Sequence, residues 1–227
     1  MSATVEELGV EQRELFSIPY LIDPRTFAFD DLVTFCVAVL IAVLVNAEAQ
    51  AYVATLLGDA RPGAKDRLHF NAFLHLDPLG TLGFLVAGMG WAKRVDVDPS
   101  KFEHPIWYLV LARCAGPFAN FLMANVAASI VWLLHTLSID ARVFMMVLAV
   151  NLTVAVYNLL PLPPLTGGAL VSALLPEQGG RFRQLYEQVG PYLLLALLLL
   201  DRIADGQIIT VHLAPHVRHL FALLIQH

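Results

Sequence analysis

The chain has 227 residues and a formal net charge of −5; 58% of its residues are hydrophobic and 15% are charged. Soluble domains carry about a quarter charged residues, so this composition excludes an ordinary soluble domain and indicates lipid as the solvent. The length suits one domain, and the lack of any basic run or stripe argues against nucleic acid as a partner.

The N-terminal segment, residues 1–31, is predicted to be an acidic tail outside the bilayer. A secretory signal peptide would need positive charge at its start, and this segment carries glutamates there instead. These are Glu6, Glu7, Glu11 and Glu14.

Five apolar runs follow, and a helix needs about 20 mostly apolar residues to span a bilayer. The runs lie at 32–58, 78–92, 105–139, 143–176 and 188–200. We therefore expect an all-α integral membrane protein with about five hydrophobic segments in a helical bundle over residues 32–200. The second run is short enough to be re-entrant. Residues 201–227 are expected to form an amphipathic, interfacial segment.

The fourth run is interrupted by PLPPLTGG at 161–168, which cannot continue a helix. Irregular backbone at membrane depth is tolerated only inside the protein or beside a water-filled cavity. This broken fourth span is therefore expected to border a site.

Four separated segments resemble the compact bacterial branch of the site-2 protease family, in the same order and at similar spacing. They are NAEAQAYVATLLGDA at 46–60, HLDPLGTL at 75–82 with GWAKRVDVDP at 90–99, AGPFAN at 115–120, and NLLPLPPLTGG at 158–168. The resemblance runs from about Leu32 to the C-terminus and implies the fold of that family, an intramembrane zinc protease.

The same resemblance implies that the zinc site is degenerate. The family reads H-E-x-x-H in the first segment, where two histidines bind zinc and the glutamate is the general base, and an aspartate in the fourth segment completes the metal shell. Here the histidine positions are Asn46 and Gln50, the base position is Ala47, and the aspartate position is Thr166. Amide, methyl and hydroxyl groups are poor zinc ligands, so zinc is expected to be absent and the chain is expected not to be an enzyme.

Two charges lie deep within apolar runs, Glu48 in the first and Arg113 in the third. An intramembrane charge needs a partner, so one hypothesis is a Glu48–Arg113 ion pair. Alternatives are a charge on another protein, or long side chains that reach water at an interface. Two residues along a helix turn a side chain by about 160°, so Glu48 cannot stand in for the missing base beside Asn46 and Gln50.

A peptide- or partner-binding groove is predicted beside the broken span, because the residues that shape the backbone there are retained. These are Asn158, Pro161, Pro163, Pro164, Thr166 and Gly167, followed by Gly168. Asn46 and Gln50, one helical turn apart, either form a polar pocket or satisfy each other as interhelical polar contacts.

The favoured function is a pseudoprotease: a membrane-embedded binding, regulatory or structural subunit that holds another membrane protein. It would be a multi-pass protein of the bacterial cytoplasmic membrane, with the lipid bilayer and a second membrane protein as its partners. One alternative is an active intramembrane metalloprotease whose zinc ligands come from outside the motif, such as His69 and His75 with Glu48. A small-solute or ion transporter is a further alternative, since broken helices also mark transport sites.

Overall fold

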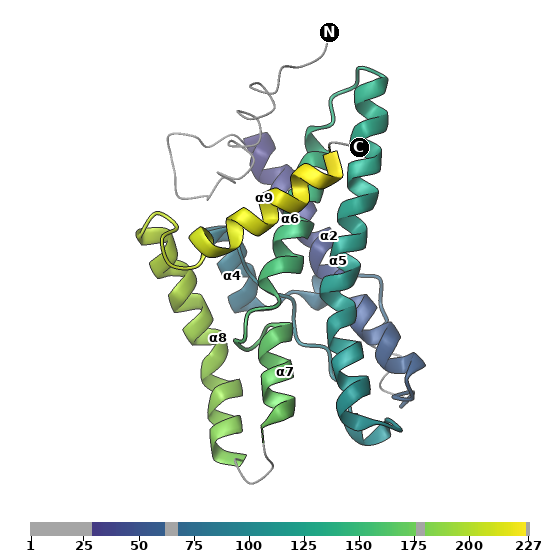
Figure 1. Ribbon diagram of the computed structural model, residues 1–227, viewed down its shortest axis with the longest axis vertical. Helices are drawn as coiled ribbons and strands as arrows, with labels where there is room; N and C mark the ends of the chain where they lie inside the picture. The colour runs from purple at the N-terminus through teal and green to yellow at the C-terminus, as the bar shows by residue number, and fades with distance from the viewer. Residues whose placement is uncertain (1–28, 62–67, 176–179, 226–227) are drawn as a thin grey trace.

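The computed structural model describes residues 29–61, 68–175 and 180–225 (Figure 1). Over these ranges the chain forms seven α-helices, two short 3-10 helices and no strand. In chain order they are α2 (Phe29–Leu56), η1 (Ala72–His75), α4 (Pro78–Ala87), η2 (Pro99–Lys101), α5 (Pro105–Thr136), α6 (Arg142–Tyr157), α7 (Thr166–Leu174), α8 (Gly180–Ile203) and α9 (Thr210–Ile225). The predicted all-helical class is confirmed, while most of the predicted N-terminal tail lies outside the described residues.

Two of the described helices, α2 and α5, are long and apolar enough to cross a membrane. This is fewer than the five spanning segments that the sequence predicted. The difference arises because apolar runs are divided by helix ends: the run at 143–176 is split between α6 and α7, with 16 and 9 residues. The second run forms α4, which has only 10 residues. These findings support a membrane protein with two helices of spanning length.

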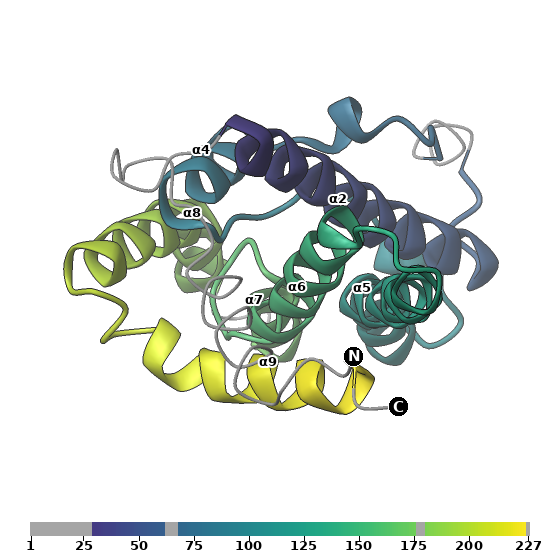
Figure 2. The same ribbon diagram turned by 90° about the horizontal axis from the view of Figure 1, so that it is seen from above.

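Helix α6 lies in the middle of the molecule, with α2 on one side and α9 on the other (Figure 2). Every residue from Met146 to Leu152 is buried. A helix that is buried all round belongs to the interior, which explains why this segment is apolar on every face. Its Asn151 is the polar exception, with no exposed surface.

Helices α2 and α5 pack together along two matching stripes of small residues. Residues at four-residue intervals share one face of a helix, and small side chains there let two backbones approach closely. The buried stripe of α2 is Ala38, Ala42, Asn46, Gln50 and Ala54, and that of α5 is Ala112, Gly116, Asn120, Ala124 and Ala128. Amide side chains interrupt both stripes, at Asn46 and Gln50 in α2 and at Asn120 in α5. The packing of the two helices therefore brings these amides together as a polar cluster.

The short helix α4 is bounded by caps that the sequence encodes. The Asp77 side chain accepts a hydrogen bond from the backbone N–H of Gly80 at 2.8 Å, and Pro78 follows it in the first turn. Gly88 ends the helix with a φ of 71°, a left-handed conformation that glycine adopts without strain. The chain then returns as an extended segment, in which Ala92 forms an isolated antiparallel bridge with Leu76.

The predicted break of the fourth span is present between α6 and α7. Helix α6 ends at Tyr157, and the chain turns back so that the Gly167 N–H donates to the Asn158 carbonyl at 2.8 Å. The Pro163–Pro164 peptide bond is cis. A side chain at Gly167 would overlap the carbonyl oxygens of Leu159 and Leu160, so the turn requires glycine there.

Candidate functional site

A chain of buried amide side chains joins helices α2, α5 and α6 at the level of the motif. Asn46 Nδ2 donates to Asn120 Oδ1 at 2.6 Å, and Gln50 Nε2 donates to Asn46 Oδ1 at 2.8 Å. Asn120 Nδ2 in turn donates to Asn151 Oδ1 and to the Ala42 carbonyl, both at 2.9 Å. Asn46 and Gln50 therefore bond to each other, as one of the two sequence hypotheses expected, and they are also tied to the neighbouring helices.

Gly116 faces this amide chain from α5. A Cβ at position 116 would lie 2.7 Å from Gln50 Nε2 and 2.8 Å from Asn46 Oδ1. The absence of a side chain on α5 therefore provides the space in which the two motif amides sit.

Arg113 lies on α5 next to the second motif position and is 5% exposed. Its Nη1 donates to Gln50 Oε1 and to the Val95 carbonyl, both at 3.0 Å. The hydroxyl of Thr166 donates to the Arg113 carbonyl at 3.3 Å. The guanidinium thus contacts Gln50, one of the two amides at the ligand positions of the family motif, and the hydroxyl of Thr166, at the third ligand position, contacts the backbone of the same arginine.

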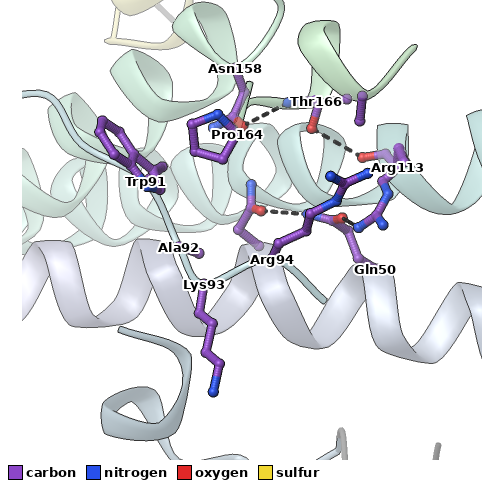
Figure 3. A pocket seen from close by; sticks show the side chains of 11 residues that line it. Gln50, Trp91, Ala92, Lys93, Arg94, Arg113, Asn158, Pro164 and Thr166 are labelled. Carbon is purple, nitrogen blue, oxygen red and sulfur yellow. Dashed lines mark hydrogen bonds between the residues drawn. The ribbon is translucent and has the colours of Figure 1, made fainter. Parts of the chain in front are cut away.

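A small cavity of about 20 Å³, with room for about one water molecule, opens beside these residues (Figure 3). It is lined by Asn46, Gln50, Trp91, Ala92, Lys93, Arg94, Arg113, Asn158, Pro164, Thr166 and Ala169. We call it the motif pocket. It brings together α2, the extended segment after α4, α5, the turn before α7 and the first turn of α7. The Lys93 side chain points away from Pro164 and Thr166 in Figure 3.

The other predicted residues of the site lie around this pocket. Ala47, at the base position, has no exposed surface and belongs to a small apolar cluster with Ala51 and Val95. The Pro161 carbonyl accepts a hydrogen bond from the Tyr186 hydroxyl at 2.6 Å. Among the predicted groove residues, Asn158, Pro164 and Thr166 line the motif pocket, whereas Pro161 and Pro163 in the turn and Gly167 at the start of α7 are not among its lining residues.

Glu48 has partners other than Arg113. Its Oε1 accepts hydrogen bonds from the backbone N–H groups of His69 at 2.8 Å and Phe70 at 2.7 Å, and it lies 2.9 Å from His75 Nε2. Its Oε2 is buried without a hydrogen-bond partner among the described residues. The structure therefore does not join Glu48 to Arg113, and Glu48 instead anchors the chain before η1.

The residues at the motif positions do not fit zinc. Zinc sites use imidazole, thiolate or carboxylate ligands, whereas the amides of Asn46 and Gln50 bond to each other and a guanidinium contacts Gln50. Within the described part of the chain, no group of three or more His, Cys, Asp or Glu side chains is arranged to hold a metal. The rings of His69 and His75 lie 5.9 Å apart, and with Glu48 they do not form such a group.

Comparison with known proteins identifies a relative in Bacillus subtilis (strain 168). "Putative zinc metalloprotease YwhC" is 33% identical over 149 residues, which cover 62% of this chain and 68% of the relative. The chain belongs to the site-2 protease-like family of this relative. No protein-family profile matches the chain, and no solved structure matches it.

This membership corrects the prediction that the chain is not an enzyme. The site-2 protease-like relative is named "Putative zinc metalloprotease YwhC", and this name points to a protease. That prediction rests on four motif positions, whereas the similarity to the relative extends over 149 residues. The loss of zinc itself stays a prediction.

Sequence reasoning missed two residues of the site, Asn120 and Asn151. Both are asparagines inside apolar runs, where an amide needs a hydrogen-bond partner. Asn120 also lies four residues after Gly116 on the same helical face, but only the packing of α5 against α2 shows that this face meets the motif amides.

Proposed function

We propose that this protein is a multi-pass intramembrane peptidase of the bacterial cytoplasmic membrane, which acts on a segment of another membrane protein held against the mouth of the motif pocket. The observation that carries this proposal is its membership of a family with a relative named as a zinc metalloprotease. The pocket supports it, because Asn46, Gln50 and Thr166 line it at three of the four positions where the family motif has its functional groups.

The extended segment beside the pocket offers a way to hold a client. The Lys93 N–H donates to the His75 carbonyl at 2.7 Å. This hydrogen bond occupies one edge of the extended segment, on the side that faces His75. Backbone groups alternate in direction along an extended chain, so those of Ala92 and Arg94 point to the opposite edge. A client segment that unwinds into an extended form would add there as a strand, with Pro164 on the other rim of the pocket.

We assign no hydrolytic step to a metal at the motif positions, because the residues there do not fit zinc. Zinc ligands would have to come from elsewhere, and Glu48, His69 and His75 are the set that the sequence suggested. Glu48 and His75 are buried together, but they do not line the motif pocket. Variants of these residues therefore test the chemistry separately from substrate binding.

The experiment is cleavage of transmembrane substrates by the purified full chain in liposomes, with products identified by mass spectrometry. We expect cleavage by the wild type and its loss in Ala169→Leu, whose larger side chain leaves no room in the pocket. Ser129→Leu, on an exposed face of α5, is the matched control and should retain activity. Loss of activity in Glu48→Gln and on addition of a chelator would identify metal ligands outside the motif. Failure of the wild type to cleave any of a panel of substrates would overturn the proposal.

A further inference from the structure

A second cavity lies outside the motif pocket, between the C-terminal part of α5 and the end of α9. Helix α9 contributes Leu224 and Ile225 to its lining, and α5 contributes five residues between positions 128 and 136. The cavity has a volume of about 390 Å³, a size typical of ligand sites in proteins, whereas the motif pocket has room for about one water molecule. We call this cavity the α5–α9 groove.

The lining of the groove changes from apolar to polar along α5. Ala128 and Val131 are buried, at 5% exposure each, and His135 and Thr136 follow one turn further on and are exposed. The two α9 residues of the lining are also apolar. An apolar part beside a polar helix end matches a phospholipid, whose acyl chains lie beneath its phosphate.

Two tryptophans place the polar end of the groove at one surface of the bilayer. Trp107 and Trp132 are exposed near opposite ends of α5, which is of spanning length. They are 25 residues apart, or about 38 Å at 1.5 Å per residue. The hydrocarbon core is about 30 Å thick, and tryptophan is enriched at its two boundaries. His135 and Thr136 lie just beyond Trp132, at the level of the lipid headgroups.

The outer face of α9 can carry several positive charges. His212, His216 and His219 recur at helical spacing and are exposed, as is Arg218 beside them, while Val217 packs into the core on the opposite face. No acidic residue occurs in α9. We call His212, His216, Arg218 and His219 the histidine face. Such a face favours an anionic surface when its histidines are protonated.

The helices that pack against α9 do not neutralise this face. They are α5 and α6. At this end of the bundle α5 carries His135 and α6 carries Arg142. The acidic residue between these helices, Asp140, forms an ion pair with Arg142 at 3.1 Å.

The turn that leads from α8 into α9 does not neutralise the face either. Asp201 is 3% exposed, and its carboxylate accepts hydrogen bonds from the backbone N–H groups of Ile208 and Ile209 at 2.8 and 2.6 Å. The turn also carries one basic and one acidic residue, Arg202 and Asp205. Among the described residues around α9, acidic groups are therefore not in excess.

We propose that the α5–α9 groove binds one anionic phospholipid, with an acyl chain against Val131 and Leu224 and the phosphate beside His135. The histidine face attracts anionic lipid to this side of the bilayer, since each cation near an anionic membrane surface strengthens binding. Histidine changes its charge between pH 5 and 8, and an anion favours the protonated form. Binding therefore strengthens as the pH falls through this range and weakens as it rises. This lipid site goes beyond the proposed peptidase activity and does not depend on it.

The test is quenching of Trp132 fluorescence by brominated phospholipids, because bromine on an acyl chain quenches a tryptophan that it contacts. The full chain with Trp91→Phe and Trp107→Phe leaves Trp132 in the groove as the reporter. It is reconstituted into phosphatidylcholine liposomes that contain a small fraction of brominated lipid. That lipid is either anionic phosphatidylglycerol or zwitterionic phosphatidylcholine. The control chain, with Trp91→Phe and Trp132→Phe, reports from Trp107 at the opposite end of α5.

At about pH 5 we expect brominated phosphatidylglycerol to occupy the groove roughly fivefold more strongly than brominated phosphatidylcholine, as expected for one cation beside an anionic headgroup. The preference should shrink at about pH 8. Trp107 should show a smaller preference or none. His135→Gln should remove most of the preference at Trp132, whereas His104→Gln, an exposed histidine at the start of α5, should retain it. Replacing the three histidines of the histidine face by glutamine should reduce the dependence on pH.

Several results would overturn the inference. Equal quenching of Trp132 by the two lipids at both pH values would mean that the groove does not select an anionic headgroup. An equal preference at Trp107 and Trp132 would indicate only a general enrichment of anionic lipid around the protein. An undiminished preference in His135→Gln would refute the position of the phosphate. Quenching by neither lipid would mean that protein, such as a second copy of this chain, covers the groove.

Discussion

Arg113 Nη1 donates to Gln50 Oε1 at 3.0 Å, although the two residues lie 63 positions apart on α5 and α2. The contact places a permanent cation against the position where the family motif has its second histidine. A divalent metal and a guanidinium would repel each other there, so this contact distinguishes the pocket from a zinc site more firmly than the missing ligands alone.

This repulsion predicts the outcome of restoring the motif. The four substitutions Asn46→His, Ala47→Glu, Gln50→His and Thr166→Asp reinstate every ligand and the base, yet we expect poor zinc binding while Arg113 remains. Adding Arg113→Leu should raise zinc affinity by at least about tenfold and give roughly one zinc per chain. Metal analysis after dialysis measures both variants. Full zinc loading of the four-substitution variant would contradict this account of Arg113.

The amide chain predicts a role for Asn120 in stability. Asn120→Ala removes its hydrogen bonds to Asn46, Asn151 and the Ala42 carbonyl, which tie α5 to α2 and α6. At roughly 0.6 kcal/mol for each interhelical bond in a membrane protein, the free energy of unfolding should fall by about 2 kcal/mol. Unfolding in mixed detergent micelles measures the change. Asn125→Ala removes a bond within α5 only and should have a smaller effect; equal effects would mean that the network does not brace the bundle.

Because Gly116 lies against the motif amides, we expect the stability of the protein to be sensitive to a single methyl group at this position. In Gly116→Ala the new Cβ would crowd Asn46 and Gln50 inside a packed core, which costs about 1–3 kcal/mol of stability. Gly180→Ala is the matched control, since a Cβ there meets nothing within 4 Å. A Gly116→Ala variant as stable as Gly180→Ala would show that α2 and α5 are not closely packed at this position.

Because Glu48 anchors the chain before η1, we expect its replacement to loosen the backbone there. Glu48→Ala removes the acceptor of the His69 and Phe70 backbone N–H groups, so hydrogen exchange of these amides should accelerate. Glu48→Gln retains one oxygen acceptor and should protect them largely as the wild type does. Glu103→Ala, an exposed glutamate, serves as the control for loss of a carboxylate. Unchanged exchange at His69 and Phe70 in Glu48→Ala would refute the anchoring role.

Part of the site was predictable from the sequence, because some of its features depend only on residues that are neighbours in the chain. The break before Thr166 follows from prolines that cannot continue a helix, and the different directions of Glu48 and Gln50 follow from helical rotation. The partners of Arg113 were not predictable, since its contacts with Gln50 and Val95 come from segments far apart in the chain. For the same reason the sequence could not show that Asn120 lies between Asn46 and Asn151.

The number of spanning helices was overestimated for a different reason. Hydropathy identifies apolar runs, but it does not show where a helix ends within one. The uncharged run at 143–176 contains the end of α6 at Tyr157, a turn, and the start of α7 at Thr166. Neither piece reaches the length of about 20 residues that a span requires.

The most direct measurement of the central claim is disulfide cross-linking between the pocket and a transmembrane substrate in liposomes. A single cysteine is placed by Ala169→Cys in a background where Cys36 and Cys114 are replaced by serine, and cysteines are scanned along the substrate segment. We predict cross-links from position 169 to a few consecutive substrate positions and none from Leu122→Cys on the exposed face of α5. Cross-links of equal strength from both positions, or from neither, would contradict the claim that a segment of another membrane protein is held against the mouth of the motif pocket.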